Sequence, residues 1–228
     1  MVAVTEATLP ASSQAVGVDV GLTSFAALST GEKVANPRWL RQREQALRRS
    51  QRNVSRKQQG SKNREKARVR LARQHVRVAD ARRDFHQQLS TRLLCEHQAV
   101  SVETLNVASL GRSNLAKSVH DAGWGQFTAM LADKADRYGR TLVKVDRWFP
   151  SSQLCSACGD RGGPAGRAGL KVRAWTCPAC GAHHDRDVNA ARNILAAGLA
   201  VAACGPGVRP GATLAVPGEA GTILAGAA

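Results

Sequence analysis

The 228-residue sequence predicts an α/β fold with a mixed sheet, into which a basic helical hairpin and a four-cysteine module are inserted. Three observations predict it. Short apolar runs of strand length alternate with helical patterns in the order β-β-β, helix, β, helix, β. One proline-free stretch carries nearly all of the positive charge, and two C-x-x-C pairs are separated by eighteen residues.

The first three strands are expected to lie side by side in antiparallel pairs. Ala15–Val20 is a short apolar run and Ser24–Leu28 is a second one. Thr30 and Gly31 supply a turn before a third strand around Lys33–Ala35. Such short connections leave no room for a crossover, so neighbouring strands must run in opposite directions.

The basic hairpin, residues 38–95, is predicted as two long helices joined by a short turn. Between Arg38 and Arg83 there are seventeen basic residues and three acidic ones, which is +14 of the formal net charge of +16. Helix-forming residues dominate, and the pattern breaks only near residues 59–61. A merely solvated helix pair usually mixes both signs, so this surface predicts binding of a polyanion, nucleic acid before an anionic membrane.

The rest of the chain completes the sheet and adds helices. Ala99–Leu105 predicts a fourth strand, Asp121–Tyr138 a helix, Thr141–Val145 a fifth strand and Arg186–Leu199 a last amphipathic helix. The expected domain organisation is a leader (1–15), a core domain (16–150) that contains the hairpin, the four-cysteine module (151–184), the last helix of the core domain (185–203) and a weakly ordered tail (204–228).

The chain is expected to act in the cytoplasm. It contains no apolar stretch of membrane-spanning length, and its first residues lack the basic and apolar regions of a secretory signal. Its length also permits a real hydrophobic core, which excludes the small disulfide-rich scaffolds.

The strongest local motif is a candidate zinc ribbon. Tetrahedral Zn²⁺ takes four thiolates, and a C-x-x-C turn followed by glycine delivers two of them. Unrelated thiols or a redox pair are the alternatives, but two matched pairs favour a metal, and four protein ligands favour a structural zinc. His183 and His184 are expected to lie outside the ligand set. The four candidate ligands are Cys155, Cys158, Cys177 and Cys180.

Three carboxylates stand at the ends of predicted core elements: Asp19 in GVDVG, Glu103 in VETLN and Asp187 in HDRDVNAARN. Acids in such places are costly unless cations offset them, and three of them suit Mg²⁺ or Mn²⁺ in phosphodiester cleavage. Asp187 has an alternative role, because an acid in the first turn of a helix caps free N–H groups. Asp146 and Asp185 are reserve acids, expected instead to cap or support turns.

The four tryptophans are Trp39, Trp124, Trp148 and Trp175. Aromatic rings stack on bases of single strands, but Trp124 and Trp148 lie in apolar contexts and are expected to pack in the core or an interface. Trp175, beside Cys177, is expected to pack over the zinc module.

Several long motifs resemble the TnpB (OrfB) proteins of bacterial insertion sequences, which are similar to the type V CRISPR effector nucleases. They are GVDVGLTSFAALSTGEKVANPRWL, SRKQQGSKNREKARVRLAR, SVETLNV, WGQFTAML, KVDRWFPSSQLCSACG and HDRDVNAARNIL. The resemblance runs from about Val16 to Leu199. It implies an RNase H-like (RuvC-type) domain in two parts, 16–150 and 185–203, with a zinc ribbon inserted before the third acid.

The same resemblance implies a function. Asp19, Glu103 and Asp187 match the family's catalytic acids, which implies two-metal hydrolysis of DNA with Mg²⁺ or Mn²⁺, directed by a guide RNA. Only about fifteen residues precede the first strand, whereas the family carries a substantial N-terminal recognition region. We therefore expect an N-terminally truncated endonuclease that binds nucleic acid through salt-sensitive phosphate contacts without programmable targeting.

Two other functions stay open at this point. One is a non-catalytic nucleic-acid-binding remnant in which the zinc ribbon and the hairpin bind and the acids are vestigial. The other is DNA-strand transfer, the activity implied by the name transposase, which the same three acids could serve. The sequence leaves the oligomeric state open.

Overall fold

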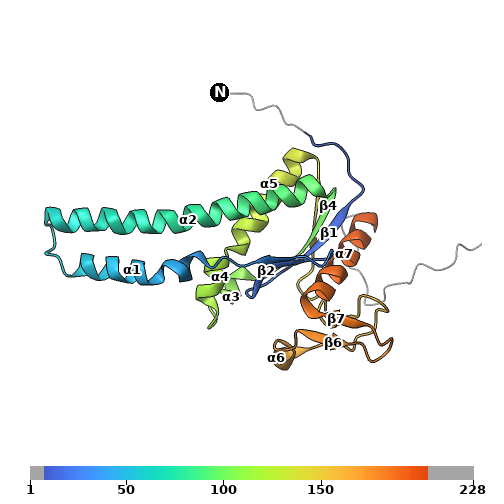
Figure 1. The fold of residues 1–228 in the computed structure, drawn as a ribbon. Coiled ribbons are helices and arrows are strands. Elements are labelled where there is room, and N and C mark those ends of the chain that lie inside the picture. The colour runs from blue at the N-terminus through green and yellow to red at the C-terminus, as the bar shows by residue number, and fades with distance from the viewer. Residues whose placement is uncertain (1–7, 205–228) are drawn as a thin grey trace, which may run out of the picture.

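The computed structural model describes residues 8–204 (Figure 1). The predicted tail lies outside the described residues except for Cys204, and so do the first seven residues of the predicted leader. No helix within residues 8–204 combines the length and the apolar character needed to cross a membrane.

A five-stranded mixed sheet forms the centre of the fold, with strand order β3-β2-β1-β4-β5. β1 pairs antiparallel with β2, and β2 with β3, whereas β1–β4 and β4–β5 are parallel. The predicted mixed sheet and its antiparallel start are therefore confirmed. The strands are β1 (Ala15–Val20), β2 (Ser24–Leu28), β3 (Lys33–Ala35), β4 (Ala99–Glu103) and β5 (Thr141–Val145).

Side-chain alternation along β1 and β4 gives the sheet two different faces. Val16 and Val18 of β1, with Val100 and Val102 of β4, are almost completely buried in the main hydrophobic cluster. This cluster also takes in apolar residues of α2 (Lys62–Glu96) and α5 (Trp124–Tyr138). Because successive side chains of a strand point to opposite faces, the residues between these valines face the other way.

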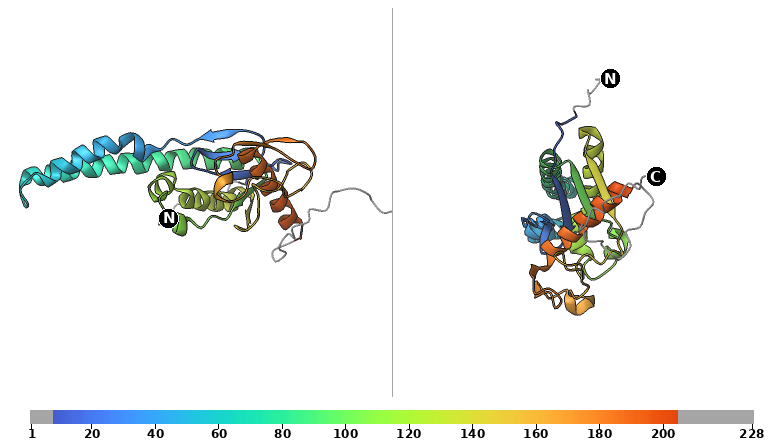
Figure 2. Two further views of the ribbon diagram at one scale, coloured as in Figure 1. Left: turned by 90° about the horizontal axis from the view of Figure 1, so that it is seen from below. Right: turned by 90° about the vertical axis from the view of Figure 1, so that its right-hand side faces the viewer.

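The other face is covered by α7 (Arg186–Cys204), which crosses it opposite α2 and α5 (Figure 2). Gly17 lies where the two elements meet: a Cβ atom at this position would stand 2.0 Å from the backbone oxygen of Ala191. A side chain there would push α7 off the sheet, so glycine is required for this close approach.

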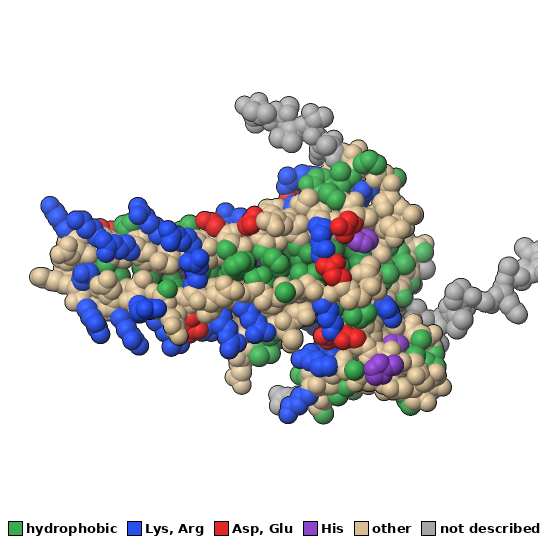
Figure 3. Space-filling model, in the orientation of Figure 1, with side chains coloured by type: hydrophobic (Ala, Val, Ile, Leu, Met, Phe, Trp, Pro, Cys, Tyr) green, Lys and Arg blue, Asp and Glu red, His purple; other side chains and the backbone are tan. Residues whose placement is uncertain are grey.

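Helices α1 (Trp39–Ser55) and α2 run antiparallel and extend well beyond the sheet (Figure 1). Ser61 begins α2 as an N-cap, its hydroxyl accepting a hydrogen bond from the Arg64 N–H. Basic side chains project from both helices along the extended part (Figure 3). Four of the seventeen basic residues of this stretch pair with a carboxylate, so most of the positive charge faces solvent.

The helix expected over residues 121–138 is confirmed from Trp124 to Tyr138, but its expected start is wrong. The segment divides into α4 (Ala116–Ala122) and α5, because Gly123 adopts a left-handed conformation with φ 68°. The break frees the carbonyl of Ala122, which lies 2.9 Å from Nε2 of the buried His86. Asp121, just before the break, accepts hydrogen bonds from the first N–H groups of α1 and fixes where that helix starts. A short helix, α3 (Val107–Leu110), precedes α4.

The four-cysteine module contains α6 (Gly166–Gly169) and a two-stranded antiparallel sheet of β6 (Ala174–Thr176) and β7 (His183–Asp185). β7 runs directly into α7, so the module lies beside the first turn of that helix (Figure 1). This places it at the edge of the main sheet where β1 and β4 end.

Candidate functional site

Two of the predicted acids, Asp19 and Glu103, come from neighbouring parallel strands. Val18 pairs with Val102, so the next residues, Asp19 and Glu103, are level with each other. They share the face of Gly17, which packs on α7. Alternation and register alone therefore bring both carboxylates to the same sheet edge, facing the start of α7.

Asp187 completes the group from the first turn of α7. A cavity of about 620 Å³ is lined by Asp19, Glu103 and Asp187 together, between the sheet edge and the four-cysteine module. Residues separated by more than eighty positions in the sequence thus meet in one concave site.

The cavity disfavours the ionised form of two of its three carboxyl groups, Asp19 and Glu103. Burial, reinforced by the charges of Glu103 and Asp187, raises the pKa of Asp19 to about 8, although Arg186 acts in the opposite direction. Burial also raises the pKa of Glu103 to about 7. A cation bound nearby would stabilise the ionised form of both groups, and carboxylate oxygens are the donors that Mg²⁺ and Mn²⁺ prefer. The residues present therefore fit divalent ions.

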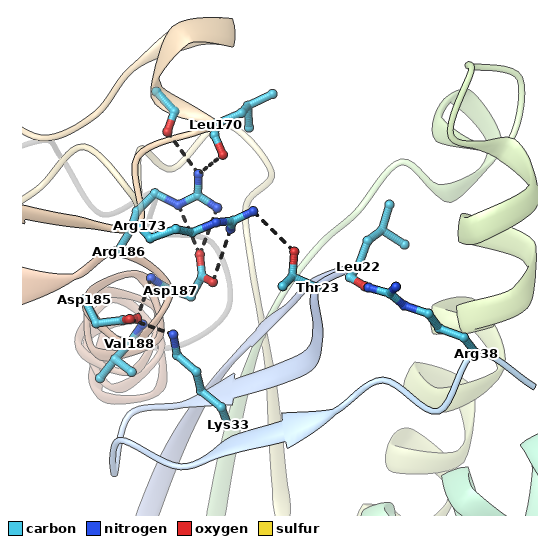
Figure 4. Close-up of polar contacts among 11 residues, drawn as sticks. Leu22, Thr23, Lys33, Arg38, Leu170, Arg173, Asp185, Arg186, Asp187 and Val188 are labelled. Atoms are coloured by element: carbon cyan, nitrogen blue, oxygen red, sulfur yellow. Dashed lines mark hydrogen bonds and ion pairs between the residues drawn. The ribbon is translucent and has the colours of Figure 1, made fainter.

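Asp187 is held by two arginines (Figure 4). Arg186 donates from Nε and NH2 to its Oδ1 atom, at 3.0 and 2.8 Å, and NH1 of Arg173 lies 3.6 Å from Oδ2. Both carboxylate oxygens thus already face a cation. The three acids share the cavity but are not close enough together to hold one ion between them as they stand. Among residues 8–204, the four cysteines are the group whose possible ligand atoms lie that close together.

The arginines also connect Asp187 to its surroundings. NH1 of Arg186 donates to the carbonyls of Gly169 and Leu170 at the end of α6, at 3.0 and 2.9 Å. Arg173 donates to the Thr23 hydroxyl, between β1 and β2, at 3.2 Å. The position of Asp187 therefore depends on the module and on the main sheet at once.

The reserve acids support turns. Oδ1 of Asp185 accepts hydrogen bonds from the N–H groups of Asp187 and Val188, and its Oδ2 pairs with Lys33 at 2.6 Å. Asp185 therefore caps α7, which assigns to it the capping role considered for Asp187. Asp146 accepts from the Trp148 N–H at 2.8 Å in the turn after β5.

The four cysteines form a compact cluster. The sulfur atoms of Cys155, Cys158, Cys177 and Cys180 all lie within 4.8 Å of one another, and Cys155–Cys180 and Cys158–Cys177 are each 3.7 Å apart. A tetrahedron with metal–sulfur bonds of about 2.3 Å needs sulfur–sulfur distances of roughly 3.8 Å. The cluster therefore fits a tetrahedral metal such as zinc.

Backbone geometry supports the same site. The glycines after each pair, Gly159 and Gly181, have positive φ angles of 79° and 74°, and their N–H groups bond to the carbonyls of Cys155 and Cys177. Hydrogen bonding from the Cys180 backbone lowers the pKa of the Cys177 thiol to about 7. The second turn thus presents the Cys177 sulfur close to the thiolate form that binds metal, whereas hydrogen bonds among the thiols leave the pKa values of Cys158 and Cys180 raised.

His184 packs directly beside the cluster. It is buried, its Nε2 atom lies 3.1 Å from the sulfur of Cys155, and its ring packs at 4.9 Å from that of Trp175. This contact would orient the Cys155 sulfur for a bound metal without adding a fifth ligand. Trp175 packs over the module as the sequence predicts, and His183 is exposed.

Sequence reasoning missed the residues that join the module to α7. The buried amides of Asn189 and Asn193 both donate to the Leu154 carbonyl, at 2.7 and 2.8 Å, and Asn193 also donates to Ser151. Their signal was two asparagines four residues apart on an otherwise apolar helix face. Arg186 was visible only as the neighbour of an acid, and Arg173 had no sequence signal.

Of the two places expected for Trp148, the core and an interface, the core is wrong. Trp124 is buried at 5% exposure as predicted, but Trp148 is 77% exposed and lines the carboxylate cavity. The apolar character of its neighbourhood comes from Phe149, which packs against the cluster of Val145, Ile194 and Ala197. The core position belongs to the residue after Trp148.

Family models match two parts of the chain. The OrfB_IS605 model, described as "Probable transposase", matches residues 1–114. The model described as "Cas12f1-like, TNB domain" matches residues 124–194, which include the four-cysteine module and Asp187.

Two curated relatives carry the same kind of name. A "Putative RNA-guided DNA endonuclease" from Streptomyces pristinaespiralis is 54% identical over 202 residues, covering 88% of this chain and 49% of the relative. "Putative RNA-guided DNA endonuclease InsQ" from Escherichia coli K12 is 32% identical over 219 residues, covering 89% and 54%. The chain thus spans about half the length of these relatives.

Two solved structures share the fold. The cryo-EM structure of a CRISPR-Cas12f ternary complex matches with a TM-score of 0.57 at 20% identity, over 86% of this chain and 40% of that one. A Cas12f1–sgRNA–target DNA complex matches with a TM-score of 0.54 at 19% identity, over 82% and 39%.

Proposed function

Because the chain belongs to the TnpB (OrfB) family of insertion-sequence proteins, we propose that it is the catalytic part of an RNA-guided DNA endonuclease with an RNase H-like, RuvC-type site. One observation carries the proposal: Asp19, Glu103 and Asp187, from three distant segments, line a single cavity. The reaction class comes from the names of relatives that are about twice as long as this chain. The residues that line the cavity suit that reaction.

Asp19 and Glu103 would hold divalent ions, with Asp187 joining them as its arginine contacts rearrange. Bound Mg²⁺ or Mn²⁺ would lower the pKa of a water molecule and neutralise charge on the phosphate. Asp19 and Glu103 are held rigidly because they continue two paired strands. Arg173 and Arg186, released from Asp187, are placed to bind phosphate oxygens, which planar guanidinium groups recognise well.

The zinc ribbon would act structurally in this proposal. Four cysteine ligands leave no open position for substrate, and the module contacts Asp187 through Arg173 and Arg186. Through these two arginines, the ribbon would hold Asp187 against the edge of the main sheet.

DNA and a guide RNA are the proposed partners. The exposed positive charge along α1 and α2 suits phosphate backbones, which form the common, sequence-independent part of every nucleic-acid contact.

Cleavage of DNA by the purified, zinc-loaded chain tests the proposal. In Mg²⁺ or Mn²⁺ the wild type should cut single-stranded DNA, and Asp19→Asn should lower the rate by roughly 10³-fold or more, because a catalytic carboxylate is lost. DNA binding, measured separately without divalent ions, should persist in both proteins.

The matched control is Asp133→Asn, which removes an exposed acid of α5 that does not line the cavity, and it should cut at the wild-type rate. A wild type that binds DNA and never cuts it would favour the non-catalytic nucleic-acid-binding alternative.

A further inference from the structure

Large apolar side chains gather at the mouth of the carboxylate cavity. Six are strongly exposed in residues 8–204, and three of them line this one cavity: Leu115 (51%), Trp148 (77%) and Leu170 (63%). Exposed apolar residues are ordinary when scattered, but a cluster around a concave site marks a binding surface. Trp148 offers by far the largest apolar area of the three.

Trp148 is held in place although its ring is exposed. Its backbone N–H donates to Oδ1 of Asp146, and the next residue, Phe149, is anchored in the small core cluster beneath α7. The ring therefore projects from a turn that is fixed on both sides. A fixed backbone leaves only the side-chain torsions to be ordered when a ligand stacks on the ring, which limits the loss of conformational entropy.

The surroundings of the ring are cationic. The guanidinium carbon of Arg147 lies 4.5 Å from the Trp148 ring centroid, in a cation–π contact. Arg161, Arg173 and Arg186 line the same cavity. A protein partner would need acidic groups to match this rim, whereas a nucleic-acid strand presents phosphates to the arginines and base faces to the ring.

We propose that Trp148 stacks on an unpaired base of the strand taken up by the carboxylate cavity, while Arg147 contacts the adjacent phosphate. The inference rests on the proposed nuclease function and names a positioning residue for it. Paired and stacked bases of a duplex hide their faces, so a stacking ring at the cavity mouth selects single-stranded nucleic acid. The stacked base would set which phosphate lies over Asp19 and Glu103.

Binding without catalysis tests this directly. The zinc-loaded chain, free of Mg²⁺ and Mn²⁺, is titrated with a fluorescent oligothymidylate and with an abasic oligonucleotide of the same length. Trp148→Ala should weaken oligothymidylate binding roughly 5- to 100-fold, the usual range for losing one base–aromatic stack, and leave abasic binding unchanged. Trp148→Tyr should restore most of the affinity, because a ring returns.

Two further readouts separate stacking from a structural effect. The slope of log affinity against log salt should be equal in wild type and Trp148→Ala, since no phosphate contact is removed. Leu199→Ala, which trims an exposed apolar residue outside the cavity, should change neither affinity.

Equal weakening for both oligonucleotides, or no weakening for either, would overturn the stacking role, as would a wild type that binds no single strand. Because no cleavage is measured, these outcomes are independent of whether the acids are catalytic. Binding of a protein partner in place of oligonucleotides, abolished by Trp148→Ala, would also overturn it.

Discussion

Asp19→Asn is expected to stabilise the zinc-loaded protein in the absence of Mg²⁺ and Mn²⁺, by roughly 5 kcal/mol at pH 7.5. The folded-state pKa of Asp19, about 8, lies well above the ordinary value of 3.8, because folding buries the group near Glu103 and Asp187. Keeping this side chain ionised, or keeping it protonated at neutral pH, costs free energy that a neutral amide of the same shape avoids.

The pH dependence follows from the same shift. Between pH 4 and pH 8 folded Asp19 retains a proton that unfolded Asp19 has released, so the free energy of unfolding falls as pH rises, by roughly 1.4 kcal/mol per pH unit for one such group. Glu103, with a pKa of about 7, adds a fall in the same direction up to pH 7. Asp19→Asn should remove the part of the slope due to Asp19.

Urea unfolding of wild type and variant from pH 5 to pH 8 measures this difference. Asp133→Asn, the exposed control, should follow the wild-type curve. Adding Mg²⁺ or Mn²⁺ should stabilise the wild type and shrink the advantage of Asp19→Asn, since a bound cation offsets the buried charge. A variant less stable than wild type at every pH would show that burying the Asp19 carboxyl group does not destabilise the protein.

Cys177→Ser is expected to abolish metal binding by the four-cysteine module and to unfold it. Zinc contributes roughly 10–16 kcal/mol to small zinc-dependent folds, which equals or exceeds the whole stability of most domains. The short β6 and β7 and the one-turn α6 bury too little to persist alone. Loss should spread to α7, because Asn189 and Asn193 bond to the module's backbone.

Zinc content and thermal unfolding measure the outcome. The wild type should hold one zinc ion per chain and Cys177→Ser none, with a melting temperature lower by about 10 °C or more. His183→Ala removes an exposed histidine next to the cluster and should retain the ion. A Cys177→Ser protein that keeps its zinc and its melting temperature would contradict a metal-stabilised module.

The main sheet was predictable because its signals are local. Apolar runs of five or six residues bounded by turn residues predicted β1, β2 and β5 at their observed limits. The parallel pairing of β1 with β4 across the whole helical stretch was not predicted, because the order of elements does not say beside which earlier strand β4 lies. The helix break at Gly123 was missed, since a glycine within an amphipathic pattern is often tolerated and only the packing of His86 shows its role.

The candidate site was predictable in its acids and cysteines but not in its contacts. Asp19 and Glu103 lie at or next to the ends of strands in recognisable motifs, and the spacing of the cysteines predicted the four that cluster. The ion pair between Arg173 and Asp187 depends on how the module folds against the sheet, which cannot be predicted from a short sequence pattern. The exposure of Trp148 was missed because the apolar segment around it predicts a buried aromatic residue, and the one that packs in the core is Phe149.

Binding of Mn²⁺, followed by the loss of the free-ion EPR signal, tests the central claim most directly: that Asp19, Glu103 and Asp187 form a divalent-metal centre. The zinc-loaded wild type and Asp133→Asn should take up Mn²⁺ saturably at pH 7.5, and Asp19→Asn and Glu103→Gln should take up little or none. Equal uptake by Asp19→Asn and the wild type would contradict the claim.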